Sequence, residues 1–296
     1  MAVTAIVGGY DLHTHTTASD GLLSPAECVA LARRQGLAGF AVTDHDTTAG
    51  VSEAARAGRE LGVDVVPGVE ISAQGDGHDV HVLGLWIDPD DAAFAARLAS
   101  NRDVRRARNL AMFEALRRHG LDVTLEEAER IAASLRPDGD ASVGRPHVAE
   151  LLVRKGYAAD IREAFDVWIG EGGKAYVTVE RVPPETAAAW IREAGGVVVL
   201  AHPGLYRDAE GLIERLARSG ALDAVEAAHA DHDERQEAAF RALAARYGLP
   251  TTGGSDFHGV RGGVPFHAML GGRRTPRDVV ERLLEMKEKR GNRNDT

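Results

Sequence analysis

Short apolar runs that end in histidine or a carboxylate alternate with helical segments at both ends of this chain. The runs "LAGFAVTD" and "VDVVPGVEIS" in the first part, and "GVVVLAH" and "LDAVEAAH" in the last, have the length and composition of strands. Strands that alternate with helices form a mainly parallel sheet, which is either open or closed into a barrel. We therefore predict an α/β fold with the ends of several strands gathered at one rim.

The middle of the chain has a different pattern. From about residue 90, the segment "DDAAFAARLASNRDVRRARNLAMFEALRRHG" is long and helical, and short helical segments follow it. The next convincing strand is "KAYVTV". We predict a barrel domain made of residues 1–95 and 180–296, with a mainly helical insertion, or cap, at residues 96–179.

Composition limits the functions that are open to the chain. A formal net charge of −10 argues against general DNA binding, because no overall positive field would attract phosphate backbones. No apolar run is long enough to cross a bilayer, so we expect no membrane partner. The single Cys28 fits a reducing compartment, and the first residues lack the basic segment of a signal peptide. We expect a cytoplasmic protein.

The polar residues that end the predicted strands are candidate metal ligands. In "DLHTHTTASD", residues 11–20, His13 and His15 alternate, so on a strand they face the same side and can bind one ion together. Histidine with carboxylate and no thiolate suits Zn²⁺, Mn²⁺ or Fe²⁺. A carboxylate such as Glu70 could bridge two ions, which is the usual arrangement for displacement at phosphorus. The other candidates at strand ends are Asp11, Asp44, His45, His81, His202, Glu226, His229, Asp256 and His258.

Several nearby polar residues have simpler explanations. We expect Asp46 to cap the helix that follows it. His78 and His81 are three apart on one strand and point to opposite faces, so only one faces the site, and we prefer His81. His267 lies in a glycine-rich loop and receives no role. The arginines of "RDVRRARN" are expected on a solvated helix face, although part of that run could contact a nucleotide.

The motifs "DLHTHT", "TDHD", "GVE", "HVLG", "AHPG" and "GSDFH" resemble those of the polymerase-and-histidinol-phosphatase (PHP) family of metallophosphoesterases, in the same order. The phrases "GRPHVAELLV" and "GEGGKAYV" are similar to the bacterial branch that acts on nucleoside 3′,5′-bisphosphates and short RNA 5′ ends. The resemblance implies a distorted (β/α)₇ barrel that holds two to three divalent ions. It favours Mn²⁺, with Zn²⁺ or Fe²⁺ as alternatives.

The resemblance also implies a role for each candidate residue. Metal-bound hydroxide would attack phosphorus with Glu70, His45 and His258 nearest, and Asp11 and Asp44 would orient the ligands. For Arg145 and His147, the alternative to phosphate binding is a solvated helix start. The first ion would be held by His13, His15, Glu70 and Asp256, the second by Glu70, His81 and His202, and the third by Asp20, His45 and His258. The candidates for binding the rest of the substrate are Arg145, His147, Lys174 and His229.

We therefore expect an enzyme that hydrolyses phosphate monoesters. The expected reaction removes the 3′-phosphate of a nucleoside 3′,5′-bisphosphate and leaves the nucleoside 5′-monophosphate. Short 5′-phosphorylated RNA is a second candidate substrate. The alternatives are a histidinol-phosphate phosphatase and a non-catalytic PHP binding module. Amide hydrolysis by a related metal-dependent barrel is disfavoured, because such enzymes often use a carboxylated lysine and no lysine ends a predicted barrel strand here.

Overall fold

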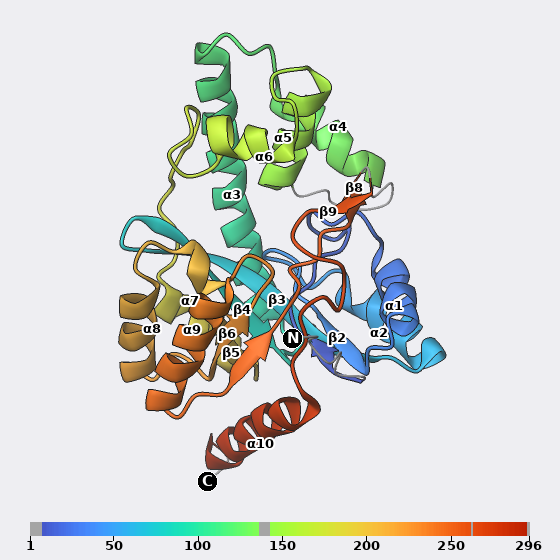
Figure 1. Ribbon diagram of the computed structural model, residues 1–296, viewed down its shortest axis with the longest axis vertical. Coiled ribbons are helices and arrows are strands. Elements are labelled where there is room, and N and C mark those ends of the chain that lie inside the picture. The colour runs from blue at the N-terminus through green and yellow to red at the C-terminus, as the bar shows by residue number, and fades with distance from the viewer. Residues whose placement is uncertain (1–7, 136–142, 262, 295–296) are drawn as a thin grey trace.

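A computed structural model describes residues 8–135, 143–261 and 263–294, and it shows a barrel with a helical insertion over one end (Figure 1). The seven-stranded sheet has the order β1-β2-β3-β4-β5-β6-β7. Its two edges meet, since Leu12 N donates to Gly253 O at 3.2 Å and Asp256 N donates to His13 O at 2.9 Å. This nearly closed barrel confirms the predicted α/β fold. Its strands are β1 (Tyr10–Asp11), β2 (Gly39–Val42), β3 (Asp64–Gly75), β4 (His78–Leu85), β5 (Val197–Leu200), β6 (Ala224–Ala228) and β7 (Thr251–Gly253).

The sheet is less parallel than predicted, because β3 and β4 form an antiparallel hairpin and β4 is also antiparallel to β5. Asp76 and Gly77 make the turn between β3 and β4, with φ of 51° and 82°. Asp-Gly is the residue pair that such a two-residue hairpin turn favours. As a result, His81 reaches the rim from the first half of its strand, whereas the other predicted ligands follow the ends of parallel strands or lie on β3.

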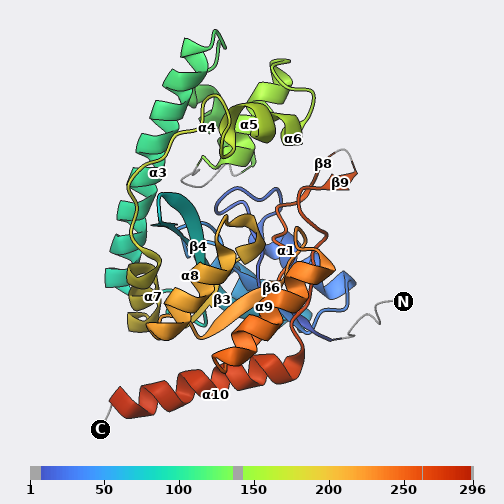
Figure 2. The same ribbon diagram turned by 60° about the vertical axis from the view of Figure 1, so that its left-hand side comes forward.

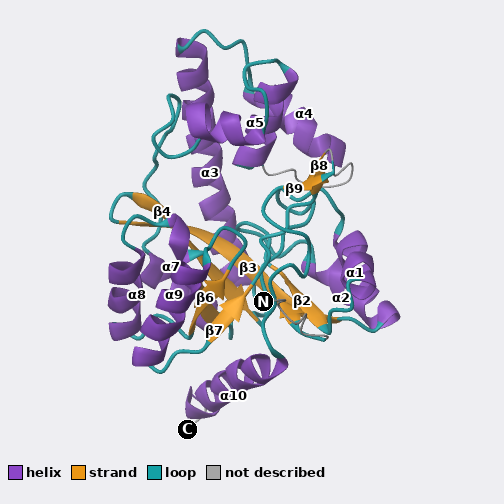
Figure 3. Ribbon diagram, in the orientation of Figure 1, coloured by secondary structure: helices purple, strands orange, loops and turns teal. Residues whose placement is uncertain are grey.

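Helices cover the outside of the barrel and one of its ends (Figure 3). Val280 and Leu283 of the last helix share a hydrophobic cluster with Leu12 and Ala41, so this helix closes the end opposite the insertion (Figure 1). In the described ranges, no helix has the length and apolar character that a membrane span requires. The barrel helices are α1 (Pro25–Arg34), α2 (Val51–Leu61), α7 (Pro184–Glu193), α8 (Ala209–Arg218), α9 (Glu234–Arg246) and α10 (Arg277–Asn294), with a short 3₁₀ helix at Pro203–Leu205.

The insertion has its own hydrophobic core and stands over the rim that carries the predicted ligands (Figure 2). Helix α3 runs unbroken across the predicted boundary at residue 96: its Leu98 packs in a barrel cluster and its Met112 in the insertion cluster. The division into two domains therefore stays a prediction. The prediction of a strand at "KAYVTV" is wrong. This segment begins in a turn, in which Ala175 N donates to Trp168 O. The insertion contains α3 (Ala92–Arg118), α4 (Leu125–Leu135), α5 (Arg145–Arg154), α6 (Ile161–Glu163) and a π-helix at Ala164–Ile169.

Candidate metal centre

Glu70 lies in the middle of a buried group of histidines at the rim beneath the insertion. Its Oε1 is 2.9 Å from His81 Nδ1 and 3.1 Å from His202 Nε2. Its Oε2 is 2.9 Å from His45 Nδ1 and 3.3 Å from His15 Nε2. The Glu70 side chain is 1% exposed. One carboxylate therefore faces histidines from four separate segments, which is the position that a bridging ligand requires.

Four of the predicted ligands offer donor atoms at the spacing of one ion site. His15 Nε2 lies 3.3 Å from His13 Nε2 and 3.1 Å from Asp256 Oδ1. His13 Nε2 lies 3.4 Å from Glu70 Oε1 and 3.4 Å from Asp256 Oδ1. Ligands held tetrahedrally at about 2.0–2.2 Å from an ion are about 3.3–3.6 Å from one another. The spacing of these four side chains therefore fits a single divalent ion.

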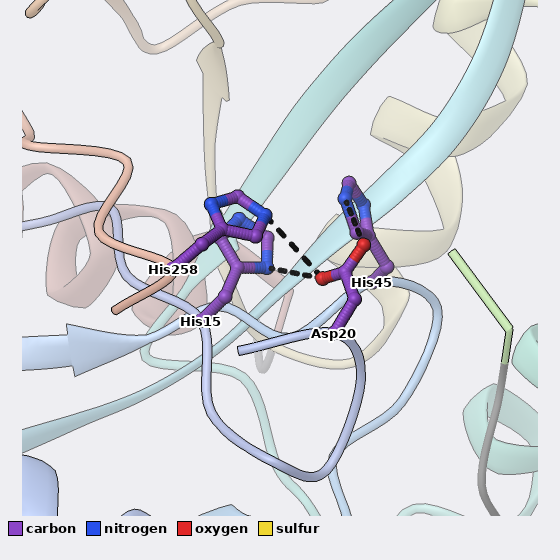
Figure 4. A group of neighbouring side chains, drawn as sticks. All are labelled: His15, Asp20, His45 and His258. Atoms are coloured by element: carbon purple, nitrogen blue, oxygen red, sulfur yellow. Dashed lines mark ion pairs between the residues drawn. The ribbon is translucent and has the colours of Figure 1, made fainter. Parts of the chain in front are cut away.

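A second group of donors converges on Asp20, as Figure 4 shows. His258 Nε2 lies 3.3 Å from Asp20 Oδ1, and His45 Nε2 lies 3.7 Å from Asp20 Oδ2. His15 joins this group through Nδ1, which is 3.8 Å from Asp20 Oδ1. His15 and His45 thus face Glu70 with one ring nitrogen and Asp20 with the other. The structure brings all nine predicted ligands into one continuous cluster.

The cluster contains buried nitrogen and oxygen atoms that lie close to one another but form no hydrogen bond to a described residue. In the described part of the chain, no hydrogen-bond partner is found for Nδ1 of His45, Nδ1 of His81, Oε2 of Glu70 or Oδ1 of Asp256. An unsatisfied buried polar atom costs about 1–3 kcal/mol, so such atoms are rare unless something else binds them. Burial lowers the pKa of His45 to about 3 and that of His202 to about 4, so both rings are neutral and keep a lone pair. This donor set fits divalent metal ions.

Two of the predicted ligands have a strained backbone. His202 and Asp256 have φ of 25° and 51°, in the left-handed region that side chains other than glycine rarely adopt. Each residue comes just after a strand, β5 or β7. Strain of this kind, which costs about 1–3 kcal/mol per residue, is typically found where a site holds a side chain in a required position.

Glu226, which the sequence placed among the candidate metal ligands at strand ends, lies behind two of the predicted ligands at the rim. Its carboxylate oxygens lie 3.1 and 3.2 Å from His13 Nδ1, and Oε2 accepts a 2.8 Å hydrogen bond from His202 N. A carboxylate behind a metal-binding histidine fixes the ring and raises its basicity. Gly254 allows this contact, because a Cβ there would lie 2.4 Å from Glu226 Oε1.

Replacing Glu226 with Gln is expected to weaken Mn²⁺ binding by about ten- to a hundredfold, because the neutral amide no longer supports His13 electrostatically. Titration against a coloured chelator measures this affinity without reference to activity. Glu234→Gln, the same change at an exposed position on α9, serves as the control. Equal affinity in the two variants would show that Glu226 is only a packing residue.

Asp11 and Asp44 accept hydrogen bonds from backbone and hydroxyl groups. Among the described residues, neither carboxylate contacts the imidazole ring of a predicted ligand. Asp11 accepts from Ser255 N at 2.9 Å and from Gly271 N at 2.7 Å, which fixes the loop that carries Asp256. Asp44 accepts from Thr16 N and from Ser19 Oγ, at 2.8 and 2.6 Å, and so fixes the loop that carries Asp20. Their predicted orienting role would therefore act through these loops.

Gly144 brings the start of the insertion helix α5 against Asp20. A Cβ at Gly144 would lie 2.1 Å from Asp20 Oδ2 and 2.9 Å from Asp20 Cβ. Gly144→Ala is therefore expected to displace Asp20 and to reduce the number of ions bound per chain. The ions held by the predicted ligands around Glu70 should remain bound. Metal analysis after gel filtration checks this. The control is Gly291→Ala, where an added Cβ meets nothing within 4 Å. A full complement of ions in Gly144→Ala would contradict the prediction.

The structure separates the residues predicted to bind the rest of the substrate. Arg145 lines the cavity beside the metal centre, and His229 lies behind it with Nε2 3.5 Å from Asp256 Oδ2. His147 is buried and its Nδ1 accepts from Gly144 N at 3.1 Å. Lys174 packs over the Trp168 ring, 4.8 Å from its centroid. Of the described residues, those that line the cavity include neither His147 nor Lys174.

Two interpretations of single residues are wrong. Asp46 caps no helix; its carboxylate accepts from Ser72 N at 2.9 Å and pairs with Arg105 at 2.8 Å. His267, to which we assigned no role, lines the cavity with Nδ1 2.6 Å from Asp231 Oδ2 and Nε2 3.3 Å from Asp256 Oδ2. In both cases a loop residue is placed in the site by contacts with residues distant in sequence.

A cavity of about 930 Å³ extends from the metal centre to the underside of the insertion. Five arginines line it, and four of them, Arg105, Arg108, Arg145 and Arg181, lie close together. Arg105 and Arg108 come from α3, where we expected a solvated face; they are 5% and 3% exposed, so that expectation is wrong for both. Arg145 begins α5, and Arg181 follows the insertion. Helical spacing places these α3 side chains on one face, and that face turns toward the cavity.

Positive charge in this cluster exceeds the negative charge beside it. Arg145 Nη1 is 2.9 Å and Arg181 Nε is 4.0 Å from the Asp79 carboxylate. Arg108 donates to Asn109 Oδ1 at 2.8 Å, and no ion pair joins it to a carboxylate of the described residues. Burial, with Arg145 and Arg181 nearby, holds the pKa of Arg108 well below its usual range. Because guanidinium stays protonated in proteins, the cluster attracts an anion.

Comparison with known proteins gives concordant matches. The PHP domain matches residues 11–193. The chain is 37% identical to the 3′,5′-nucleoside bisphosphate phosphatase of Chromobacterium violaceum, covering 84% of this chain and 86% of that one. It is 35% identical to the 5′-3′ exoribonuclease Rnm of Escherichia coli, covering 84% and 85%. A solved structure from Chromobacterium violaceum, described as an amidohydrolase with bound sulfate and no metal, matches with a TM-score of 0.83 at 35% identity, covering 95% and 97%.

Proposed function

The chain belongs to the PHP family of metal-dependent phosphoesterases, and we propose that it removes the 3′-phosphate of nucleoside 3′,5′-bisphosphates to leave the nucleoside 5′-monophosphate. The observation that supports this most directly is that one cavity contains both the candidate metal centre and the cluster of Arg105, Arg108, Arg145 and Arg181. A substrate with two phosphates can occupy both parts at once. The name of the relative from Chromobacterium violaceum supports the same substrate.

The arginine cluster is our candidate for holding the phosphate that is not hydrolysed. Within this cluster of four guanidinium groups, Arg105 pairs with Asp46, and Arg145 and Arg181 share Asp79, so four positive charges have two carboxylate partners among the described residues. Nε of Arg105, Arg145 and Arg181 is buried with no hydrogen-bond partner in the described ranges. A phosphate dianion would balance the charge and accept these donors. Arg145 thus keeps its predicted role, with Arg105, Arg108 and Arg181 in place of His147 and Lys174.

The metal centre is our candidate for holding the phosphate that is hydrolysed. We propose Mn²⁺ as the resident ion, with Zn²⁺ or Fe²⁺ as alternatives, because its ligands are imidazoles and carboxylates. Bound ions would supply charge stabilisation for the attacked phosphoryl group and would acidify the water that attacks it. Glu70, His45 and His258 line the cavity and would lie nearest the reacting phosphorus. Glu226 would keep His13 and His202 in place, and the insertion would limit access of bulk water.

The alternatives fit the cavity less well. Histidinol phosphate carries a single phosphate and an ammonium group, so it would leave the arginine cluster without an anion. A non-catalytic binding module would not require a buried cluster of histidines and carboxylates, with several atoms that form no hydrogen bond to the described residues, beside an anion cavity. Short 5′-phosphorylated RNA remains a second candidate substrate, because about 930 Å³ is near the upper end of the usual range for small-ligand pockets, ~300–1,000 Å³.

The test is phosphate release by the Mn²⁺-loaded protein from adenosine 3′,5′-bisphosphate, with 5′-AMP, 3′-AMP and histidinol phosphate measured in parallel. We expect a higher kcat/KM for the bisphosphate than for the other three esters, with 5′-AMP as the product. Equal turnover of all four esters would refute the substrate assignment and leave the phosphoesterase activity standing. Absence of turnover of every ester would refute the proposed function.

A further inference from the structure

The wall of the cavity that faces the arginine cluster across the rim carries an apolar patch. Helix α3 stands on one side of the space beneath the insertion, and the hairpin of β8 (Val260–Arg261) and β9 (Val264–Pro265) stands on the other (Figures 1 and 2). The hairpin side contributes Val264, Pro265 and Phe266 to the lining. The insertion contributes Ile161 and Phe165, beside the charged side chains of Asp160, Arg162 and Asp166.

Two phenylalanines form the centre of the apolar patch. The rings of Phe165 and Phe266 have centroids 5.7 Å apart at an interplanar angle of 44°. Phe266 also meets the ring of His258, a predicted metal ligand, with centroids 5.7 Å apart and an angle of 72°. Both phenylalanines are only partly buried, so part of each ring faces the cavity. An aromatic surface therefore runs from the metal centre to the insertion.

We propose that Phe165 and Phe266 form the subsite that binds the nucleobase of the substrate by stacking. This inference rests on the proposed function. With one phosphate at the metal centre and the other at the arginines, the ribose lies between them, and the remaining group of a nucleoside bisphosphate is a flat aromatic base. Aromatic side chains bind bases through their faces, and stacking tolerates every base because each has a π-face. Burying the faces of a base against the apolar patch of the cavity removes apolar surface from water, which favours binding there.

The subsite has one half on the barrel and one half on the insertion. Phe266 follows β9, and Phe165 belongs to the π-helix of the insertion. The contact between the two phenylalanine rings thus joins the barrel to the insertion. The base would therefore contact both parts of the molecule, and its binding would favour the arrangement in which the insertion covers the metal centre.

The test compares adenosine 3′,5′-bisphosphate with 1,2-dideoxyribose 3,5-bisphosphate, which keeps both phosphates and lacks the base. The unchanged protein is expected to prefer the nucleotide by at least about tenfold in kcat/KM, the effect of losing one stacked base. Phe165→Leu combined with Phe266→Leu should abolish this preference by raising KM for the nucleotide. Because Phe266 also contacts His258, metal content after gel filtration and a cooperative thermal transition show separately that the metal centre and the fold are intact.

Two further variants complete the test. Phe165→Tyr with Phe266→Tyr keeps both aromatic faces and is expected to retain the preference, whereas Leu61→Ala, at an exposed position on α2, is the surface control. If the unchanged protein hydrolyses both esters equally well, or if the Leu variant keeps its preference, the base subsite is refuted and the bisphosphatase activity stands. If the unchanged protein hydrolyses neither ester, the proposed function fails and the subsite with it.

Discussion

Glu70→Gln is expected to lower the rate of phosphate release by more than about a hundredfold. Mutating a residue that only supports a metal ligand from behind typically lowers metal affinity or activity by about ten- to a hundredfold. Glu70 is itself a predicted ligand, so its replacement should have a larger effect. Its two oxygens lie within 3.4 Å of ring nitrogens of His13, His15, His45, His81 and His202. An amide of the same shape keeps the packing but loses the charge that two neighbouring cations require. The measurements are initial rates with the bisphosphate, and metal content after dialysis.

The matched control is Glu60→Gln, the same substitution at an exposed position on α2. It should keep the rate and the metal content of the unchanged protein. Glu70→Gln should bind fewer ions while keeping a cooperative thermal transition, which separates loss of metal from loss of fold. Full activity in Glu70→Gln would mean that the histidines hold the ions without a bridging carboxylate, and the proposed centre would be wrong.

Arg108→Met is expected to weaken substrate use and to strengthen the fold. Arg108 is 3% exposed, and it lies near other arginines without an ion pair to a carboxylate of the described residues. Charged hydrogen bonds contribute about 1.5–3 kcal/mol, so KM for the bisphosphate should rise by about ten- to a hundredfold. Methionine removes an uncompensated buried charge, and such replacements can raise the free energy of unfolding by about 1–4 kcal/mol.

Two measurements on one protein preparation check this prediction. Steady-state kinetics with adenosine 3′,5′-bisphosphate and 3′-AMP should show the KM effect for the bisphosphate only, because 3′-AMP lacks the phosphate that the arginines would hold. A urea unfolding curve should show the gain in stability. Arg118→Met, near the exposed end of the same helix, should change neither quantity. A lower free energy of unfolding, together with an equal drop in kcat/KM for both substrates, would mean that Arg108 stabilises the fold and does not bind the substrate.

The residues around Glu70 illustrate what a pattern along the chain can predict. His13 and His15 alternate in sequence, and the structure places both Nε2 atoms within 3.3 Å of each other. Asp256 follows a short strand and approaches the same two rings. Parallel strands place their carboxyl ends at one rim, so residues distant in sequence were expected to meet there.

Arg108, Glu226 and His147 illustrate what the pattern leaves open. Helical spacing indicates that Arg105 and Arg108 share a face, but a face that turns toward a polar cavity has the same spacing as one that faces solvent. Glu226 was noted as a strand-end carboxylate, yet its place behind His13 depends on the twist of the neighbouring strands. His147 follows Arg145 closely along the chain, but α5 turns it into the core while Arg145 faces the cavity.

The sequence alone determined the fold class, and it predicted the chemistry of the site: the types of candidate metal ligand and their order along the chain. These properties depend on residue identity and on local periodicity, which a single chain displays directly. Only the tertiary structure decided which charges are balanced and which are not. The excess charge of the arginines, the carboxylate behind His13 and the aromatic wall all depend on distances between segments far apart in sequence. Those distances are set by how the insertion packs over the barrel, and no local pattern encodes them.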